Sequence, residues 1–298
     1  MSADRVDKAW QKQGLGKYSV GAILGTLGHY GVRVSEEELK TQSAEKFPLA
    51  LAEGWMKSWK GTGQFARFPV HAADELWARL NPDRLSPTRY AQALAALLTE
   101  LSRLLQGAQD AKVGPGFKAL DEVKAQVPMT EGKPSIAFVS EVAARLGDEG
   151  MKFFQRVAVD LAQQGHLDDA EEVANLEAFL FPQLSGISQA MVKAAKGGAD
   201  KEQAVGELVA IGKDTSRESI SRITALDALI HANAYEPALG LARELFDTAE
   251  KDNDFHVALD AGERLVWLLD KTGKREDARA LNERLGKVAE AHGHAHQH

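Results

Sequence analysis

The sequence contains no cysteine, which removes several kinds of chemistry before any motif is considered. Disulfide bonds, thiolate nucleophiles and thiolate metal ligands are all excluded. Proline is scarce as well, at 9 of 298 residues, whereas the residue types that lose little freedom in a helix recur throughout. The composition therefore predicts an all-α protein.

Long apolar runs are also missing. The longest stretch with few charges, residues 18–30, is interrupted by glycines and is shorter than the roughly 20 residues that cross a bilayer. The first eight residues are charged and lack the apolar core of a secretion signal. We expect a cytoplasmic protein without a membrane partner.

Charge is distributed unevenly along the chain, whose formal net charge is −7. Residues 1–130 hold 17 Lys and Arg against 14 Asp and Glu, whereas residues 131–298 hold 19 against 29. Nucleic-acid binding depends on clustered basic side chains, so the acidic half argues against a nucleic-acid partner. It favours a basic protein or peptide instead.

Four short turns recur along the second half of the chain, each between two segments of helical periodicity. Their closing alanines stand 34, 34 and 40 residues apart, in the segments Gly165–Ala170, Ala199–Ala204, Asn233–Ala238 and Gly273–Ala278. A period of this length is typical of stacked helix pairs, because one pair cannot bury its apolar face alone. Short turns between helices predict antiparallel neighbours.

The unit around the first turn resembles the tetratricopeptide repeat family. Six residues match that family's large, small and turn positions: Phe154, Ala158, Leu161, Gly165, Ala170 and Pro182. The later units keep Ala204, Ala238 and Ala278, and Tyr235 stands at an aromatic position, but the early tryptophan and the closing proline are missing. The resemblance covers residues 149–291 and implies a TPR-like α-solenoid that binds a protein segment; an α-solenoid of another family is the alternative.

Two breaks separate this region from the first half of the chain. Residues 107–116 contain Gly-Pro-Gly, and residues 127–134 contain two prolines. We therefore predict an irregular N-terminal helical domain at 1–130, helical repeats at 131–291 and a disordered His-rich tail at 292–298. Helix starts are predicted by the pairs Ser35 with Glu38 and Thr215 with Glu218, and by Ser86 followed by proline.

Catalytic motifs are not found. The sequence has no Gly-x-Ser-x-Gly elbow, and its glycine-rich turns lack the residues of a phosphate-binding loop. Pairs of acidic residues open several second helices, where the helix dipole favours negative charge. We expect no catalytic residue, no cofactor and no enzyme activity.

The tail carries the one predicted metal site, formed by His292, His294, His296 and His298. Four imidazoles on a flexible segment can chelate Ni²⁺, Zn²⁺ or Cu²⁺ without a fold. Native metal handling, a purification feature and an incidental end are the three interpretations.

Aromatic residues are densest in the first half, at Trp55, Trp59, Phe65, Phe68 and Trp77. A packed core is the simpler interpretation, since aromatic rings contribute large buried area wherever they cluster. A small-molecule pocket is the alternative. Our leading hypothesis is a protein–protein adaptor, with metal handling by the tail or ligand binding at this cluster as alternatives.

Overall fold

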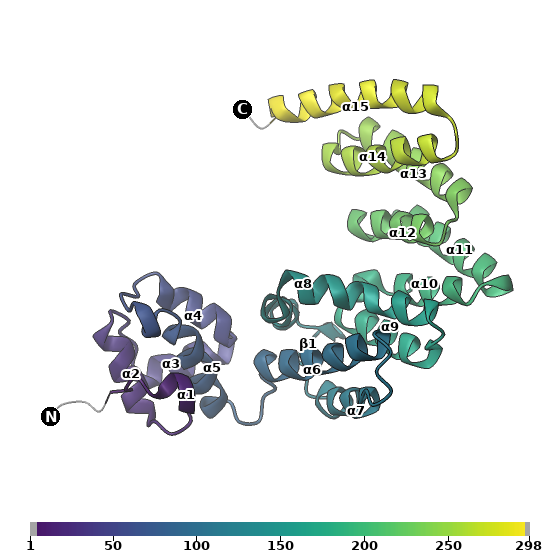
Figure 1. Cartoon of the computed structure of the whole chain (residues 1–298). Helices are drawn as coiled ribbons and strands as arrows, with labels where there is room; N and C mark the ends of the chain where they lie inside the picture. The colour runs from purple at the N-terminus through teal and green to yellow at the C-terminus, as the bar shows by residue number, and fades with distance from the viewer. Residues whose placement is uncertain (1–4, 296–298) are drawn as a thin grey trace. The chain divides into compact units, whose positions relative to one another are not determined.

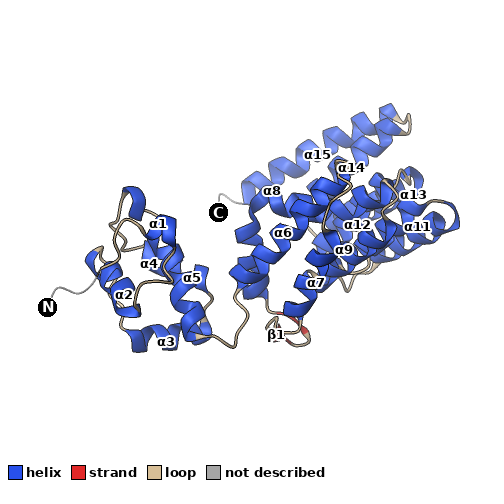
Figure 2. Cartoon of the chain, turned by 60° about the horizontal axis from the view of Figure 1, so that its bottom comes forward, coloured by secondary structure: helices blue, strands red, loops and turns tan. Residues whose placement is uncertain are grey.

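The computed structural model describes residues 5–295, with side chains described for residues 5–289. Within this range the protein is all-α, as its composition predicts, with 15 α-helices. The described strands are β1 (Met129–Thr130) and β2 (Lys133–Pro134), which pair as a small antiparallel hairpin (Figure 2). The chain divides into two compact units, Met1–Phe153 (unit 1) and Phe154–His298 (unit 2).

Unit 1 is built from short helices joined by irregular turns. They are α1 (Trp10–Gln13), α2 (Val20–His29), α3 (Glu36–Glu45), α4 (Pro48–Met56), η1 (Gly63–Phe65), α5 (Phe68–Leu80), α6 (Pro87–Leu105), α7 (Val113–Lys124) and the first part of α8 (Ile136–Gln163). Two predicted helix starts are confirmed. The Ser35 hydroxyl accepts from Glu38 N at 3.1 Å while the Glu38 carboxylate accepts from Ser35 N at 2.8 Å. Ser86 caps α6, and the following proline is its first helical residue.

The boundary between the units falls after Phe153, whereas the sequence predicted it after residue 130. The first part of α8 belongs to unit 1 because Phe138 is fully buried there, with ring centroids 5.8 Å from Phe47 and 5.6 Å from Tyr90. Glu141, one turn later, accepts from Leu49 N at 2.8 Å. A left-handed glycine, Gly147 (φ 70°), then interrupts the helical backbone.

Unit 2 is a succession of helices in chain order (Figure 1). After the end of α8 come α9 (Leu167–Leu180), η2 (Pro182–Leu184), α10 (Ile187–Lys196), α11 (Gly198–Lys213), α12 (Ser219–His231), α13 (Tyr235–Lys251), α14 (Phe255–Lys271) and α15 (Arg275–Ala295). Each helix from α9 to α15 contacts the next one along the chain. Alternate helices also touch, in the pairs α10–α12, α11–α13 and α12–α14.

Three of the predicted turns have the same backbone structure. Gly165, Asn233 and Gly273 lie in the left-handed region, with φ of 89°, 56° and 82°. In each turn the backbone N–H of the residue that follows donates to the carbonyl oxygen five residues before it, at 2.8 to 3.0 Å. The donors are His166, Ala234 and Lys274. This pattern ends one helix and satisfies its last carbonyl groups before the next helix begins.

The other two local predictions in unit 2 are corrected. The turn expected at residues 199–204 lies inside α11, because the adjacent glycines Gly197 and Gly198 (φ 80° and 58°) place the break earlier. Thr215 does not cap a helix, since α12 begins at Ser219 without a side-chain cap. Asp214 instead accepts from the N–H and hydroxyl of Ser216, at 3.0 and 2.6 Å.

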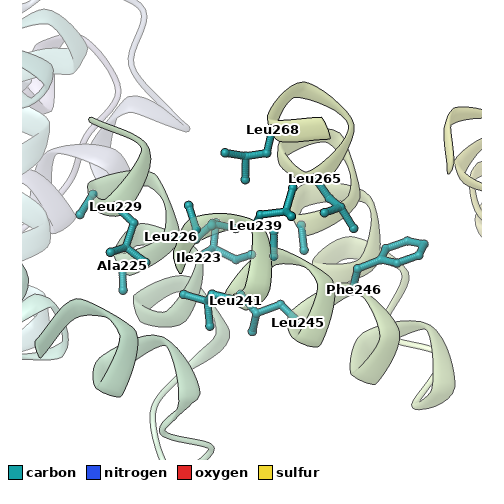
Figure 3. Packing of buried hydrophobic residues seen from close by; sticks show 14 of the residues in the cluster. Ile223, Ala225, Leu226, Leu229, Leu239, Leu241, Leu245, Phe246, Leu265 and Leu268 are labelled. Atoms are coloured by element: carbon teal, nitrogen blue, oxygen red, sulfur yellow. The ribbon is translucent and has the colours of Figure 1, made fainter. Parts of the chain in front are cut away.

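The core of unit 2 lies between successive helices. Figure 3 shows buried side chains of this cluster on three successive helices, among them Leu226 of α12, Leu241 and Leu245 of α13 and Leu265 of α14. The periodic alanines are buried as well: Ala204 and Ala238 are fully buried and Ala278 is 7% exposed within this core, and Ala170 is fully buried outside it. Small residues at these positions let neighbouring helices pack closely.

Candidate protein-binding surface

The candidate surface of unit 2 belongs to the first helix of each successive pair, and we call it the first-helix face. It is formed by α8 from Phe154 onward, α10, α12 and α14, of which α10–α12 and α12–α14 are in contact. Side chains three and four residues apart lie on one face of a helix. On this face α12 and α14 present the exposed or partly exposed residues Ile220, Thr224, Asp227, His231, Asp260, Arg264, Trp267 and Lys271.

An ion pair joins α12 to α14 across this face. Arg264 donates from Nε to Asp227 Oδ1 at 2.6 Å and from Nη2 to Asp227 Oδ2 at 2.8 Å. A third bond runs from Arg264 Nη1 to the backbone oxygen of Asp260 at 2.7 Å. The planar guanidinium matches the carboxylate in a two-pronged contact, which fixes the orientation of both side chains.

One turn beyond Arg264, the tryptophan Trp267 is 45% exposed. Its ring meets Tyr235 edge to face at a centroid distance of 5.9 Å, and the Lys271 ammonium lies 5.9 Å from the ring centre. Glu263 and Asp270 are exposed on the same helix, four residues before and three after. A large aromatic side chain held on a rigid helix and surrounded by charge is typical of an interface anchor.

A small cavity of about 130 Å³ opens where α8, α10 and α12 meet. Its apolar lining comes from Val159, Met191, Ala194, Ala195, Ala228 and Ala232, and its polar lining from Gln163, Lys201, His231 and Asn233. Small-molecule sites are usually larger, at about 300–1,000 Å³. This cavity is smaller than that range.

The sequence-predicted metal site lies at the edge of the described region. His296 and His298 lie outside the described residues, and α15 reaches Ala295 without a description of the His292 and His294 side chains. The backbone of residues 292–295 belongs to α15, and the remaining tail residues lie outside the described range. Among the side chains described, residues 5–289, no group of three or more His, Asp or Glu is placed to hold a metal ion.

The aromatic cluster of unit 1 lies in the core. Phe68 and Trp77 are fully buried, and Trp55 and Phe65 are less than 10% exposed. The half-buried Trp59 stacks on Phe68 at 5.9 Å, and its indole N–H donates to Phe65 O at 3.1 Å. Trp77 Nε1 likewise donates to Lys46 O at 2.9 Å. Satisfied and packed indoles favour the core interpretation of this cluster over a ligand pocket.

Glu177 of α9 is a buried carboxyl group that the sequence analysis missed. It is 3% exposed and accepts from the Ser188 hydroxyl of α10. Burial raises the pKa of Glu177 to about 7, although the Ser188 hydrogen bond lowers it. The signal in the sequence was its position four residues after Val173 and three before Leu180, on the apolar stripe of the helix.

Trp267 was not predicted from the sequence, because it stands apart from the dense aromatic cluster of the first half. The buried stripe of α14 follows Ala258, Ala261, Leu265 and Leu268 at helical spacing. Trp267 falls outside that stripe, so its exposure could have been read from the sequence.

Comparison with protein-family models, with curated proteins and with solved structures gave no match to this chain. Among the residues the structure describes, no helix is both long enough and apolar enough to span a membrane.

Proposed function

We propose that this protein is an adaptor that binds a segment of another protein on the first-helix face. In this proposal the helices of unit 2 form a TPR-like α-solenoid, in which stacked pairs present one extended surface. Support comes from the chain-order contacts of the helices, the shared turn structure and the buried periodic alanines. The proposal includes a cytoplasmic location and no catalytic or cofactor role.

The exposure of Trp267 is the observation that carries the proposal. Its half-exposed ring costs free energy in water, because burying apolar area contributes about 25 cal/mol for each Å². Tyr235 and Lys271 hold the ring in place, so a partner does not have to order it. Such pre-organised aromatic anchors contribute much of the affinity in protein interfaces.

The charge around this anchor favours a basic partner. Asp260, Glu263 and Asp270 of α14 are exposed. Arg264 pairs with Asp227 and lies 3.8 Å from Asp260, and Arg275 lies 3.5 Å from Asp270, so Glu263 is the carboxylate of this group without an ion pair among the described residues. A lysine or arginine of the partner would gain attraction from these carboxylates and from the Trp267 ring. Complementary charge speeds the encounter more than it strengthens the final complex.

Site-specific photo-crosslinking in the full-length chain tests the proposal. A photoreactive amino acid at position 267 is compared with one at Met56 of unit 1, which is also 45% exposed. We expect a partner protein to be captured from position 267 and not from position 56. Equal capture from both positions contradicts the proposal.

Affinity measurements with the captured partner complete the test. Trp267→Ala is expected to weaken binding tenfold or more, roughly 2 kcal/mol, as loss of an interface anchor does. Met56→Ala is the matched control and is expected to leave affinity unchanged. Binding should also weaken as salt is added, because the carboxylates of α14 attract a basic partner. Unchanged affinity of the Trp267→Ala variant for the partner would contradict the proposal that the first-helix face is the binding surface.

A further inference from the structure

A second surface, in unit 1, has a different character. An open groove of about 880 Å³ runs beside α5. The α5 side of the groove is lined by Arg67, His71, Glu75, Ala78 and Asn81. These positions recur every three or four residues, so the groove follows one face of α5 along its full length. A helix of 13 residues is about 20 Å long.

Residues outside α5 line the groove at its ends and along its side. Trp10 and Gln64 line it near the start of α5. The opening of α6 lies alongside the middle of α5, where the Thr88 hydroxyl donates to Asp74 Oδ1 at 2.7 Å. Arg84 lies near the end of α5, with its guanidinium 5.1 Å from the Trp77 ring centre.

Both carboxylates that line the groove are paired with arginines, one of which, Arg145, also donates to the buried Glu141 at 2.8 Å. Asp74 accepts two bonds from Arg145, at 2.6 and 3.1 Å. Glu75 accepts from Arg79 at 2.7 Å. A ligand in the groove therefore meets little net negative charge from these residues.

Three guanidinium groups lining the groove have no carboxylate partner among the described residues: Arg67, Arg84 and Arg89. Arg84 is held rigidly, because its Nη1 donates to the carbonyl oxygens of Ser43 and Ala44 at 3.0 and 3.2 Å. Its Nε and Nη2 groups remain available to a ligand. The groove is thus a positively charged channel with at least one pre-oriented arginine.

We propose that this groove binds an extended acidic segment of a partner protein. An extended chain rises about 3.3 Å per residue, so about six residues match the length of α5. Guanidinium groups at the start, side and end of the groove would pair with carboxylates spaced along such a segment. The site is separate from the first-helix face and prefers the opposite charge.

The geometry favours a peptide over other anions. Small-molecule sites enclose their ligands in mostly apolar walls, whereas this groove is open and carries the exposed side chains of Arg67, His71 and Arg89. Single-stranded nucleic acid needs open aromatic rings on which bases stack. The Trp10 ring is only 4% exposed, since Phe68 and His71 lie 5.3 and 5.2 Å from it.

Fluorescence anisotropy with labelled hexaglutamate and the full-length chain tests the proposal. The test variant is R67Q/R89Q, because neither side chain has a protein partner among the described residues and its loss leaves the fold intact. The matched control is R33Q/K57Q, which removes two exposed charges of unit 1 outside the groove. Circular dichroism verifies that both variants keep the helical content of the wild type.

We expect R67Q/R89Q to weaken hexaglutamate binding about tenfold, as the loss of two partly exposed ion pairs does, and R33Q/K57Q to change it less than twofold. Labelled hexalysine should not bind the groove. Equal weakening by both variants, or no hexaglutamate binding by the wild type, overturns the proposal. Tighter binding of inorganic tripolyphosphate or of a thymidine hexanucleotide than of hexaglutamate also overturns it, in favour of a phosphate site.

Discussion

Gly262 of α14 lies against Leu285 of α15 so closely that a methyl group on Gly262 would overlap Leu285 Cδ2 and stand 3.1 Å from Phe246 Cδ2. The glycine therefore permits α13, α14 and α15 to approach one another. Overpacking of this kind costs about 1–3 kcal/mol, whereas alanine gains about 1 kcal/mol in helix propensity. We predict that Gly262→Ala lowers the free energy of unfolding by about 1 kcal/mol, measured by urea denaturation.

Gly240→Ala in α13 is the matched control. Gly240 is exposed, and a methyl group there meets nothing within 4 Å. The same replacement is expected to raise the free energy of unfolding by about 0.5–1 kcal/mol, because only helix propensity and unfolded-state entropy act. Equal stabilisation by both variants contradicts the packing assigned to Gly262.

Glu177 makes stability depend on pH in an unusual direction for a carboxyl group. Its folded-state pKa of about 7 lies above the ordinary value of 4.5. Between these values the folded chain binds more protons than the unfolded chain, so its contribution to stability is complete below pH 4.5 and is lost as pH rises through 7. This difference in pKa between the folded and unfolded chain corresponds to about 3 kcal/mol of unfolding free energy.

The Glu177→Gln variant isolates this effect, because the amide oxygen still accepts from Ser188 and carries no charge. We predict that the wild type loses about 3 kcal/mol of unfolding free energy relative to Glu177→Gln between pH 5 and pH 9. Urea denaturation at several pH values measures the difference. Parallel curves for the two proteins would show that Glu177 is not held in its neutral form.

The sequence predicts the helical class and much of unit 2, because the signals there are local. The turns at Gly165, Asn233 and Gly273 need left-handed residues, and the alanines five residues later need close packing, so both leave a periodic pattern in the sequence. The sequence prediction placed one turn at residues 199–204, whereas the helix break lies at Gly197 and Gly198. The prediction relied on the spacing of the alanines, which does not depend on where these two glycines stand.

Features of unit 1 depend on contacts between distant residues, which leave no local pattern. The boundary after Phe153 follows from Phe138 packing on Phe47, and the groove charge depends on Arg145 neutralising Asp74, 71 positions earlier in the chain. The composition of the N-terminal half shows only that its net charge is small. The ion pairs of the folded chain show which arginines have no carboxylate partner among the described residues.

Metal binding by the His-rich end stays a prediction. Calorimetric titration with Ni²⁺ and Zn²⁺ compares the full chain with one that ends at residue 291. If His292, His294, His296 and His298 chelate the ion, the shorter chain loses uptake, and uptake by the full chain falls as acid protonates the imidazoles. Equal uptake by the two chains would show that these histidines bind no metal.

The Asp227–Arg264 ion pair is expected to position Trp267 on the first-helix face. Its side chains are 37% and 27% exposed, so a double-mutant cycle with Asp227→Asn and Arg264→Gln should give a coupling free energy of about 0.5–1 kcal/mol at low salt. The coupling should shrink in 1 M salt, where the screening length is about 3 Å. The exposed pair Glu149–Lys152 is the matched control and should show no measurable coupling.

Partner binding separates this positioning role from stability alone. If the ion pair aligns α14 with α12, Asp227→Asn should weaken binding of the partner captured at Trp267. This effect does not require contact between the partner and the side chain at position 227. Lys152→Gln should leave that affinity unchanged. A cycle with no coupling between Asp227 and Arg264, together with unchanged partner affinity, would mean that Trp267 is held by Tyr235 and Lys271 without help from α12.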